Sequence, residues 1–164
     1  MARLVLVGLP GVGMSTIGER VARELGVAFV DLDEEIARAV GVSAGEYLRL
    51  HGEAEFRRVE YEQLRSVMAS DVVLAPGGGV VTTPAARALL RDERVVVWLQ
   101  APVEALLARL GSTDRPLLEG DANDRLQRLD RERSGFYAEL ATDTIDGSRG
   151  IDDVVRDVVA CVTT

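Results

Sequence analysis

The sequence predicts a single α/β domain, residues 1–164, with a five-stranded parallel sheet flanked by helices. Two patterns predict this fold class. Short apolar runs of strand length alternate with longer segments of helical periodicity along the whole chain. The apolar runs contain almost no polar residue, which is typical of parallel strands that are covered on both faces. A chain of 164 residues is long enough to bury a sizeable core in one domain.

The expected strands are short, apolar and rich in β-branched residues. The first ends at Gly8, and the third is followed by Pro76 and three glycines, so turn residues bound both. The fourth is apolar throughout and contains Trp98, which we expect in the core. The five strands are predicted at residues 3–7, 27–31, 72–75, 95–99 and 142–145.

Apolar residues at helical spacing predict a helix in each interval between strands. Gly26 and Gly41 are expected to end the first two helices, and Gly52 to interrupt the third. Thr83 and Pro84 form a typical N-cap and first-turn pair. Residues 111–123 are polar and contain glycine, which predicts a mobile loop. The helices are predicted at residues 15–25, 33–40, 43–69, 84–90, 102–110, 124–140 and 151–162.

Composition excludes several classes of protein. The net charge of −8 argues against a nucleic-acid-binding protein, and no apolar run approaches the roughly 18 residues of a membrane span. A single cysteine, Cys161, excludes an internal disulfide framework, so we expect a cytoplasmic protein. The chain contains no lysine, and arginines gather between residues 109 and 133. Such a gathering in an acidic protein indicates a local site for a small anion.

A glycine-rich segment, Gly8 to Thr16, joins the first strand to the first helix. It fits the pattern G-x-x-x-x-G-K-[ST] except at the lysine, where Met14 stands. Glycines allow backbone N–H groups to wrap a phosphate, and the following helix presents its positive end to the same anion. We therefore expect ATP·Mg here, with the Ser15 hydroxyl on Mg²⁺. The predicted nucleotide contacts come from Gly11, Val12, Gly13, Met14, Ser15 and Thr16.

Met14 removes a positive charge from this loop. A lysine at this position reaches the β- and γ-phosphates and neutralises charge as the phosphoryl group moves. Methionine has a similar length and no charge. Losing one preorganised transition-state donor costs on the order of 10²–10³ in rate. The sequence therefore predicts nucleotide binding with very slow turnover.

Further motifs follow the loop in order: Asp31-Leu32-Asp33, residues 52–60 (GEAEFRRVE), Pro76-Gly77-Gly78-Gly79, Arg115-Pro116-Leu117-Leu118, and Arg133 four residues before Tyr137. With the phosphate loop, they resemble the shikimate kinase family over nearly the full chain. The resemblance implies a P-loop kinase fold with a mobile lid at about residues 111–123. It also implies transfer of the ATP γ-phosphate to the 3-hydroxyl of shikimate, in the pathway to aromatic amino acids.

The resemblance also assigns roles to single residues. Asp33 would bind the ring hydroxyls and orient or deprotonate the attacking one, with Asp31 nearer the metal. Arg57 and Arg133 would bind the substrate carboxylate, and Glu60 would hold Arg57 in place and contact a substrate hydroxyl. The remaining assignments are Gly77, Gly78 and Gly79 against the substrate, Arg115 over the phosphates, and Arg109 and Arg149 beside the adenine.

Two alternatives remain open from sequence. One is a non-catalytic relative that binds the same ligands, which Met14 alone favours. Because the other matched site residues are present, we expect Met14 to be an engineered substitution or a recent loss instead. The other is a P-loop kinase for another small substrate, such as gluconate or a nucleoside monophosphate. Two arginines near Asp33 and the triple glycine suit a compact acid with hydroxyls better than a base. We expect a monomer with ATP and shikimate as ligands, and no nucleic-acid or membrane partner.

Overall fold

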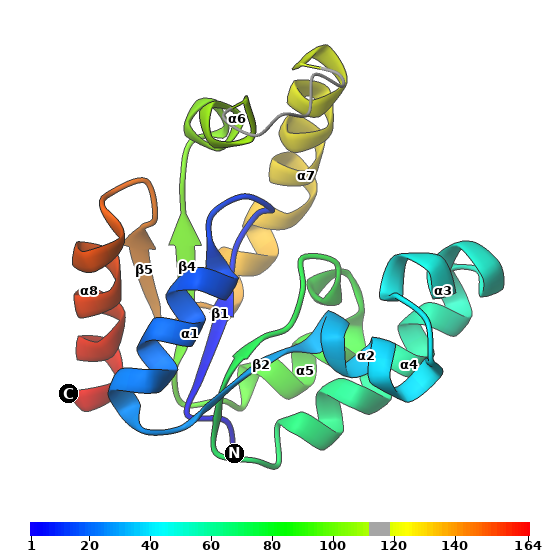
Figure 1. The fold of residues 1–164 in the computed structure, drawn as a ribbon, viewed down its shortest axis with the longest axis horizontal. Coiled ribbons are helices and arrows are strands. Elements are labelled where there is room, and N and C mark those ends of the chain that lie inside the picture. Colours follow the sequence, from blue (N-terminus) through cyan, green and yellow to red (C-terminus); the bar gives the residue numbers. More distant parts are fainter. Residues whose placement is uncertain (112–118) are drawn as a thin grey trace.

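The computed structural model describes residues 1–111 and 119–164, which form an α/β domain around a five-stranded sheet (Figure 1). The strand order is β2-β3-β1-β4-β5, and all neighbouring strands are parallel. This confirms the predicted fold class. The strands are β1 (Leu4–Val7), β2 (Ala28–Asp31), β3 (Val72–Ala75), β4 (Val96–Gln100) and β5 (Asp143–Asp146).

The helices fall in the predicted intervals, mostly with ends shifted by one residue. Gly52 adopts φ 82° and separates α3 from α4, as its position in the sequence predicted. A short 3₁₀ helix, Val80–Thr82, was not predicted. The α-helices are α1 (Met14–Leu25), α2 (Leu32–Val40), α3 (Ala44–His51), α4 (Glu53–Val67), α5 (Pro84–Arg91), α6 (Val103–Gly111), α7 (Glu119–Leu140) and α8 (Ile151–Thr163).

One expectation about local structure was wrong. Residues 119–123, predicted as part of a mobile loop, belong to α7, and residues 112–118 of the predicted loop and lid lie outside the described residues. Gly120 and Asn123 have low helix propensity, but continuity with a 22-residue helix overrides it. Thr83 and Pro84 form the predicted N-cap and first-turn pair of α5, although the Thr83 side chain makes no capping hydrogen bond. Pro84 in the first turn has no N–H group, so this end has one donor fewer to satisfy.

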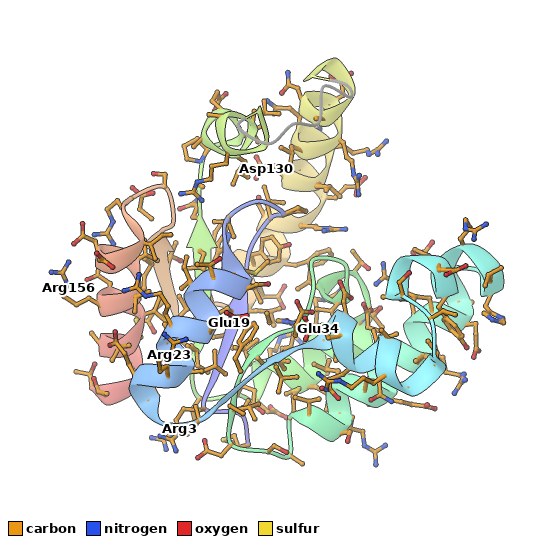
Figure 2. The ribbon with its side chains drawn as sticks, in the orientation of Figure 1. Arg3, Glu19, Arg23, Glu34, Asp130 and Arg156 are labelled. Carbon is orange, nitrogen blue, oxygen red and sulfur yellow. The ribbon has the colours of Figure 1, made fainter. Side chains whose placement is uncertain are left out.

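Helices cover both faces of the sheet (Figure 1). α1 and α8 pack against each other on one face, while α4, α5 and α7 cover the other. The buried core includes all four residues of β1 and of β3. Charged side chains such as Arg156 on α8 project from the outer surfaces of the helices (Figure 2). Among the described residues, every helix is too short or too polar to cross a membrane.

Candidate active site

The glycine-rich segment connects β1 to α1 at the carboxyl edge of the sheet. β1 is the central strand, with β3 on one side and β4 on the other, and the direction of strand addition reverses here when the chain crosses from β3 to β4. Ligands of open α/β sheets bind at such a switch point. Gly11 and Gly13 adopt φ 89° and 93°, which only glycine adopts without strain. α1 has no side-chain cap and no acidic residue in its first turn, so its first amides are available to an anion.

Met14 is the first residue of α1 and packs against the hydrophobic core with part of its side chain. The packing function of a long, unbranched side chain is therefore kept at this position. The ammonium group that a lysine would carry beyond this core contact is absent. The loop consequently has the backbone geometry of a phosphate site with one positive charge fewer.

The two predicted metal residues lie next to each other. The Ser15 hydroxyl is 3.5 Å from Oδ2 of Asp31, across the gap between α1 and the end of β2. Oδ1 of Asp31 accepts a 2.9 Å hydrogen bond from the Asp33 amide and caps α2, which fixes the carboxylate. A hydroxyl and a carboxylate beside a phosphate loop are the hard oxygen donors that Mg²⁺ prefers. The residues present therefore fit a magnesium ion held jointly with phosphates.

The three glycines after β3 bring the predicted acceptor-site residues together. Gly77 has φ 81°, and a Cβ there would lie 3.5 Å from Oδ1 of Asp33. A Cβ at Gly78 would overlap Nη1 of Arg133, and one at Gly79 would lie 2.6 Å from Nη2 of Arg57. Residues from α2, α4 and α7 thus meet over one strip of bare backbone. We refer to residues 77–79 as the glycine strip.

Each arginine of this group has a guanidinium N–H donor without a hydrogen-bond partner among the described residues. Nη1 of Arg57 donates to Glu60 at 2.7 Å, and only 3% of Glu60 is exposed. The Nε atoms of Arg57 and Arg133 are buried and have no hydrogen-bond partner in the described part of the chain. Buried donors without partners are uncommon, because each costs free energy. A ligand cannot reach these buried atoms, but both side chains are only partly buried, so the two guanidinium groups on one strip still fit a site for a carboxylate.

The carboxylates of this site have raised pKa values. Asp33 keeps contact with solvent, but the surrounding protein removes part of its hydration and raises its pKa. The negative charge of Asp31 raises that pKa further, and Arg57 opposes both effects. Burial raises the pKa of Glu60, and the hydrogen bond from Arg57 opposes it. Both groups therefore favour folding most at low pH, and this contribution is lost as pH rises through their folded pKa values.

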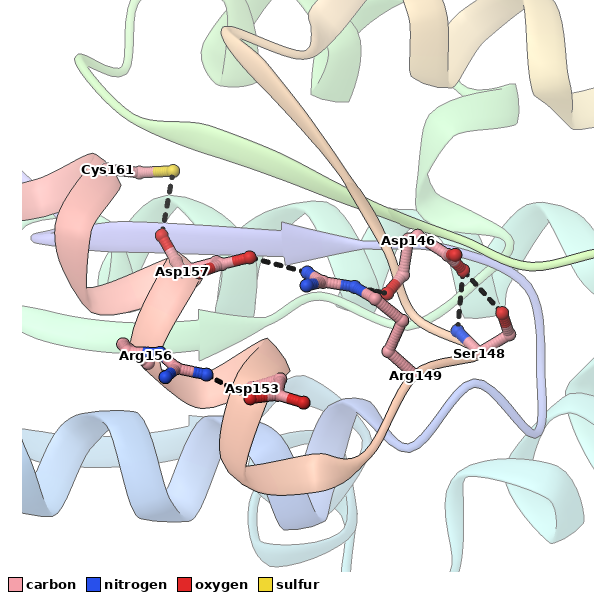
Figure 3. A network of polar contacts seen from close by, with 7 residues as sticks. All are labelled: Asp146, Ser148, Arg149, Asp153, Arg156, Asp157 and Cys161. Atoms are coloured by element: carbon pink, nitrogen blue, oxygen red, sulfur yellow. Dashed lines mark hydrogen bonds and ion pairs between the residues drawn. The ribbon is translucent and has the colours of Figure 1, made fainter.

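The two arginines predicted beside the adenine line a small cavity of about 140 Å³ next to the phosphate loop. Arg109 donates to the Val12 carbonyl at 3.0 Å and to the Gly147 carbonyl at 2.7 Å, and so ties the loop to the β5–α8 turn. Arg149 pairs with Asp157 on α8 at 2.5 Å (Figure 3). Arg115, predicted over the phosphates, lies outside the described residues.

Sequence reasoning missed two features of this site. Arg109 braces the carbonyls of the phosphate loop, which no local pattern indicates because Arg109 and Val12 are 97 residues apart. Tyr137 was recognised only as the end of a motif, yet its hydroxyl is buried between the phosphate loop and the glycine strip. Its position four residues after Arg133, on the same helix face, was the one available signal. His51, the only histidine in the sequence, is exposed and lies against Tyr47.

We expect Gly78→Ala to weaken binding of a carboxylate ligand by about tenfold or more with little loss of stability. The added methyl group would displace the flexible end of Arg133 rather than backbone, so the fold can adjust while the guanidinium moves. Calorimetric titration and thermal unfolding of the variant measure the two effects. Gly45→Ala on α3, where an added Cβ meets nothing within 4 Å, is the matched control. Equal affinities for both variants would contradict the assignment.

Comparisons with known proteins agree with this geometry. Residues 10–163 match the family model of shikimate kinase. A shikimate kinase of Mycobacterium avium is 42% identical over 149 residues, covering 90% of this chain and 85% of that protein. One of Geobacter metallireducens is 41% identical over 160 residues, 94% and 88% of the two chains. The structure of shikimate kinase from Acinetobacter baumannii in complex with shikimate has a TM-score of 0.86 and 33% identity, covering 98% of this chain and 92% of that one. This chain therefore belongs to the shikimate kinase family.

Proposed function

We propose that this chain binds ATP·Mg and shikimate side by side and transfers the γ-phosphate to the 3-hydroxyl of shikimate, slowly because of Met14. One observation carries the proposal. The glycine strip gathers Asp33, Arg57 and Arg133 at the same edge of the sheet as the phosphate loop. This arrangement offers two cations for one carboxylate and one base for a hydroxyl.

The acceptor half of the site derives from the geometry of its charges. Arg57 and Arg133 bind the shikimate carboxylate, and planar guanidinium groups suit its two oxygens. Glu60 is a positioning residue, because its carboxylate is buried and accepts a hydrogen bond from Arg57. Asp33 lies at Gly77, at the opposite end of the strip from Gly79 and Arg57, so a compact ring anchored by its carboxylate presents a hydroxyl to Asp33. Asp33 orients that hydroxyl and accepts its proton.

The nucleotide half uses the phosphate loop and the cavity beside it. Amides of Gly11 to Thr16 bind the phosphates, and Ser15 and Asp31 hold the magnesium ion. When bound, Mg²⁺ neutralises charge on the β- and γ-phosphate oxygens. Arg109 and Arg149 line the base end of the site. Arg115 is proposed to cover the phosphates from the segment outside the described residues.

Met14 supports a second candidate, a non-catalytic protein that binds the same ligands without turnover. The slow enzyme is favoured because a long-abandoned active site should have lost more than one residue, whereas Asp33, Arg57 and Arg133 are all present. A single-turnover experiment separates the two. Enzyme in excess over shikimate is incubated with ATP·Mg for hours, and phosphoshikimate is detected by ³¹P NMR. Product above a no-enzyme control supports the slow kinase, and its absence supports the binding protein.

Substrate class is tested by calorimetric titration with shikimate, gluconate and a nucleoside monophosphate. We expect shikimate to bind most tightly, because its single carboxylate matches the two arginines of the glycine strip. The Gly78→Ala variant serves as the control for binding at this site. Preference for gluconate or for the monophosphate would overturn the proposed substrate.

A further inference from the structure

The hydroxyl group of Tyr137 connects two halves of the site that are far apart in the sequence. Tyr137 lies on α7 and is fully buried. Its hydroxyl donates to the Gly8 carbonyl at 3.1 Å and reaches the Gly78 carbonyl at 3.4 Å. Gly8 begins the phosphate loop at the end of β1, and Gly78 is the centre of the glycine strip. One side chain thus contacts the backbone of both half-sites.

The contact at Gly78 also involves Arg133, one helical turn before Tyr137. Nη1 of Arg133 lies against the Cα of Gly78, on the side where a Cβ would stand. The charge of Arg133 lowers the pKa of Tyr137, whereas the dominant effect, burial, raises it. The phenol therefore stays protonated at neutral pH and remains a donor. A bound carboxylate that attracts Arg133 therefore changes the contact between Arg133 and Gly78. The carbonyl of this same glycine faces the Tyr137 hydroxyl.

A phenol has one proton to donate, so the two carbonyls share it. Movement of either carbonyl toward the hydroxyl changes the bond to the other. Tyr137 is fully buried and its ring lies 5.8 Å from that of Trp98, so bulk solvent does not compete for the hydroxyl. The position of Gly8 is therefore linked to the position of Gly78 through a single atom.

We propose that Tyr137 is a positioning residue that couples nucleotide binding to acceptor binding. The inference rests on the proposed function, since it requires that both ligands bind at this edge of the sheet. Ordering of Gly78 and Arg133 by shikimate also orders Gly8 through the hydroxyl, so the nucleotide binds to a loop that is already fixed. By linkage, the nucleotide strengthens shikimate binding by the same factor.

The test is a thermodynamic cycle with Tyr137→Phe, which removes only the hydroxyl. Calorimetry measures shikimate affinity with and without a saturating, non-hydrolysable ATP analogue and Mg²⁺. We expect positive coupling in the unchanged protein and a coupling factor about 3- to 10-fold smaller in the variant, the range of one hydrogen bond. Affinity for shikimate alone should change by less than about twofold, because the ring and its packing remain.

The matched control is Trp98→Phe, which disturbs the packing around Tyr137 and keeps its hydroxyl. A purely structural role of Tyr137 predicts that both variants lose stability and keep the coupling. Unchanged coupling in Tyr137→Phe, or its equal loss in Trp98→Phe, overturns the inference. If both ligands bind the unchanged protein but neither changes the affinity for the other, the inference is also overturned. Failure of either ligand to bind the unchanged protein refutes the proposed function instead, so the two failures are distinguishable.

A second measurement uses the unmutated chain, in case Tyr137→Phe does not fold. The chain has three tyrosines, so incorporation of 3-fluorotyrosine gives three ¹⁹F NMR signals, assigned with Tyr47→Phe and Tyr61→Phe. We expect the Tyr137 signal to shift with the nucleotide alone and with shikimate alone. If the chemical shift of Tyr137 changes with only one ligand, or with neither, the proposed coupling is contradicted.

Discussion

Met14→Lys will raise the turnover number with ATP·Mg and shikimate by about 10²–10³-fold. The loop that precedes α1 already has the two left-handed glycines and the uncapped helix end of a phosphate site. An ammonium at residue 14 supplies the charge that this geometry lacks, and it acts on the oxygens that gain charge during transfer. The stem of lysine can keep the core contact of Met14, so we expect little change in thermal stability.

Steady-state assays of both proteins under identical conditions measure this effect. Met14→Gln is the matched control, because glutamine is long, polar and uncharged and so separates charge from polarity. We expect the glutamine variant to remain as slow as the methionine protein. Equal turnover of the methionine and lysine proteins would show that another group already supplies the charge, and the proposed effect of Met14 would be wrong.

Asp33→Asn in the Met14→Lys background is expected to lower the turnover number by about 10²–10⁴-fold, the usual contribution of a general base. Asparagine keeps the shape and hydrogen-bonding capacity of the side chain beside Gly77 but cannot accept the proton. The neighbouring Glu34→Gln on the same helix is the control, and it should leave turnover unchanged. Comparable turnover with and without the Asp33 substitution would exclude this residue as the base.

The raised pKa of Asp33 gives this prediction a pH dependence. A base must be deprotonated, so turnover should fall as pH drops through a pKa that lies above the ordinary aspartate value. The same carboxylate disfavours folding at neutral pH, because its charged form is partly desolvated and lies near Asp31. Asp33→Asn should therefore raise the melting temperature at pH 7 while it lowers turnover. Thermal unfolding at pH 4 and pH 7 tests this, since the gain should shrink at the lower pH.

The sequence predicted the sheet and the phosphate loop well because both depend on local patterns. β3 was predicted to the residue, since Pro76 and the glycines delimit it on one side. The start of α7 was missed, because Gly120 and Asn123 have low helix propensity and their local sequence favours a loop. The 22-residue helix that includes them is not evident from these residues alone. Local propensity is a weak signal that a continuing helix can override.

The candidate residues were predicted one at a time, whereas their arrangement was not. Asp33, Arg57 and Arg133 were assigned from motifs, but nothing in the sequence showed that each would face a different glycine of the strip. The contact between Tyr137 and Gly8 joins residues 129 positions apart. Such contacts follow from strand order and helix placement, which periodicity alone does not give.

The glycine strip limits how this protein can be redesigned. Its three positions form the floor of the proposed acceptor site, and a methyl group at Gly78 or Gly79 would displace the guanidinium group of Arg133 or Arg57. Substitution there therefore moves the arginines that are proposed to bind the carboxylate. A variant made to accept a bulkier acid must gain its volume from the surrounding walls, on α2, α4 and α7, where side chains can be shortened without touching the backbone beneath.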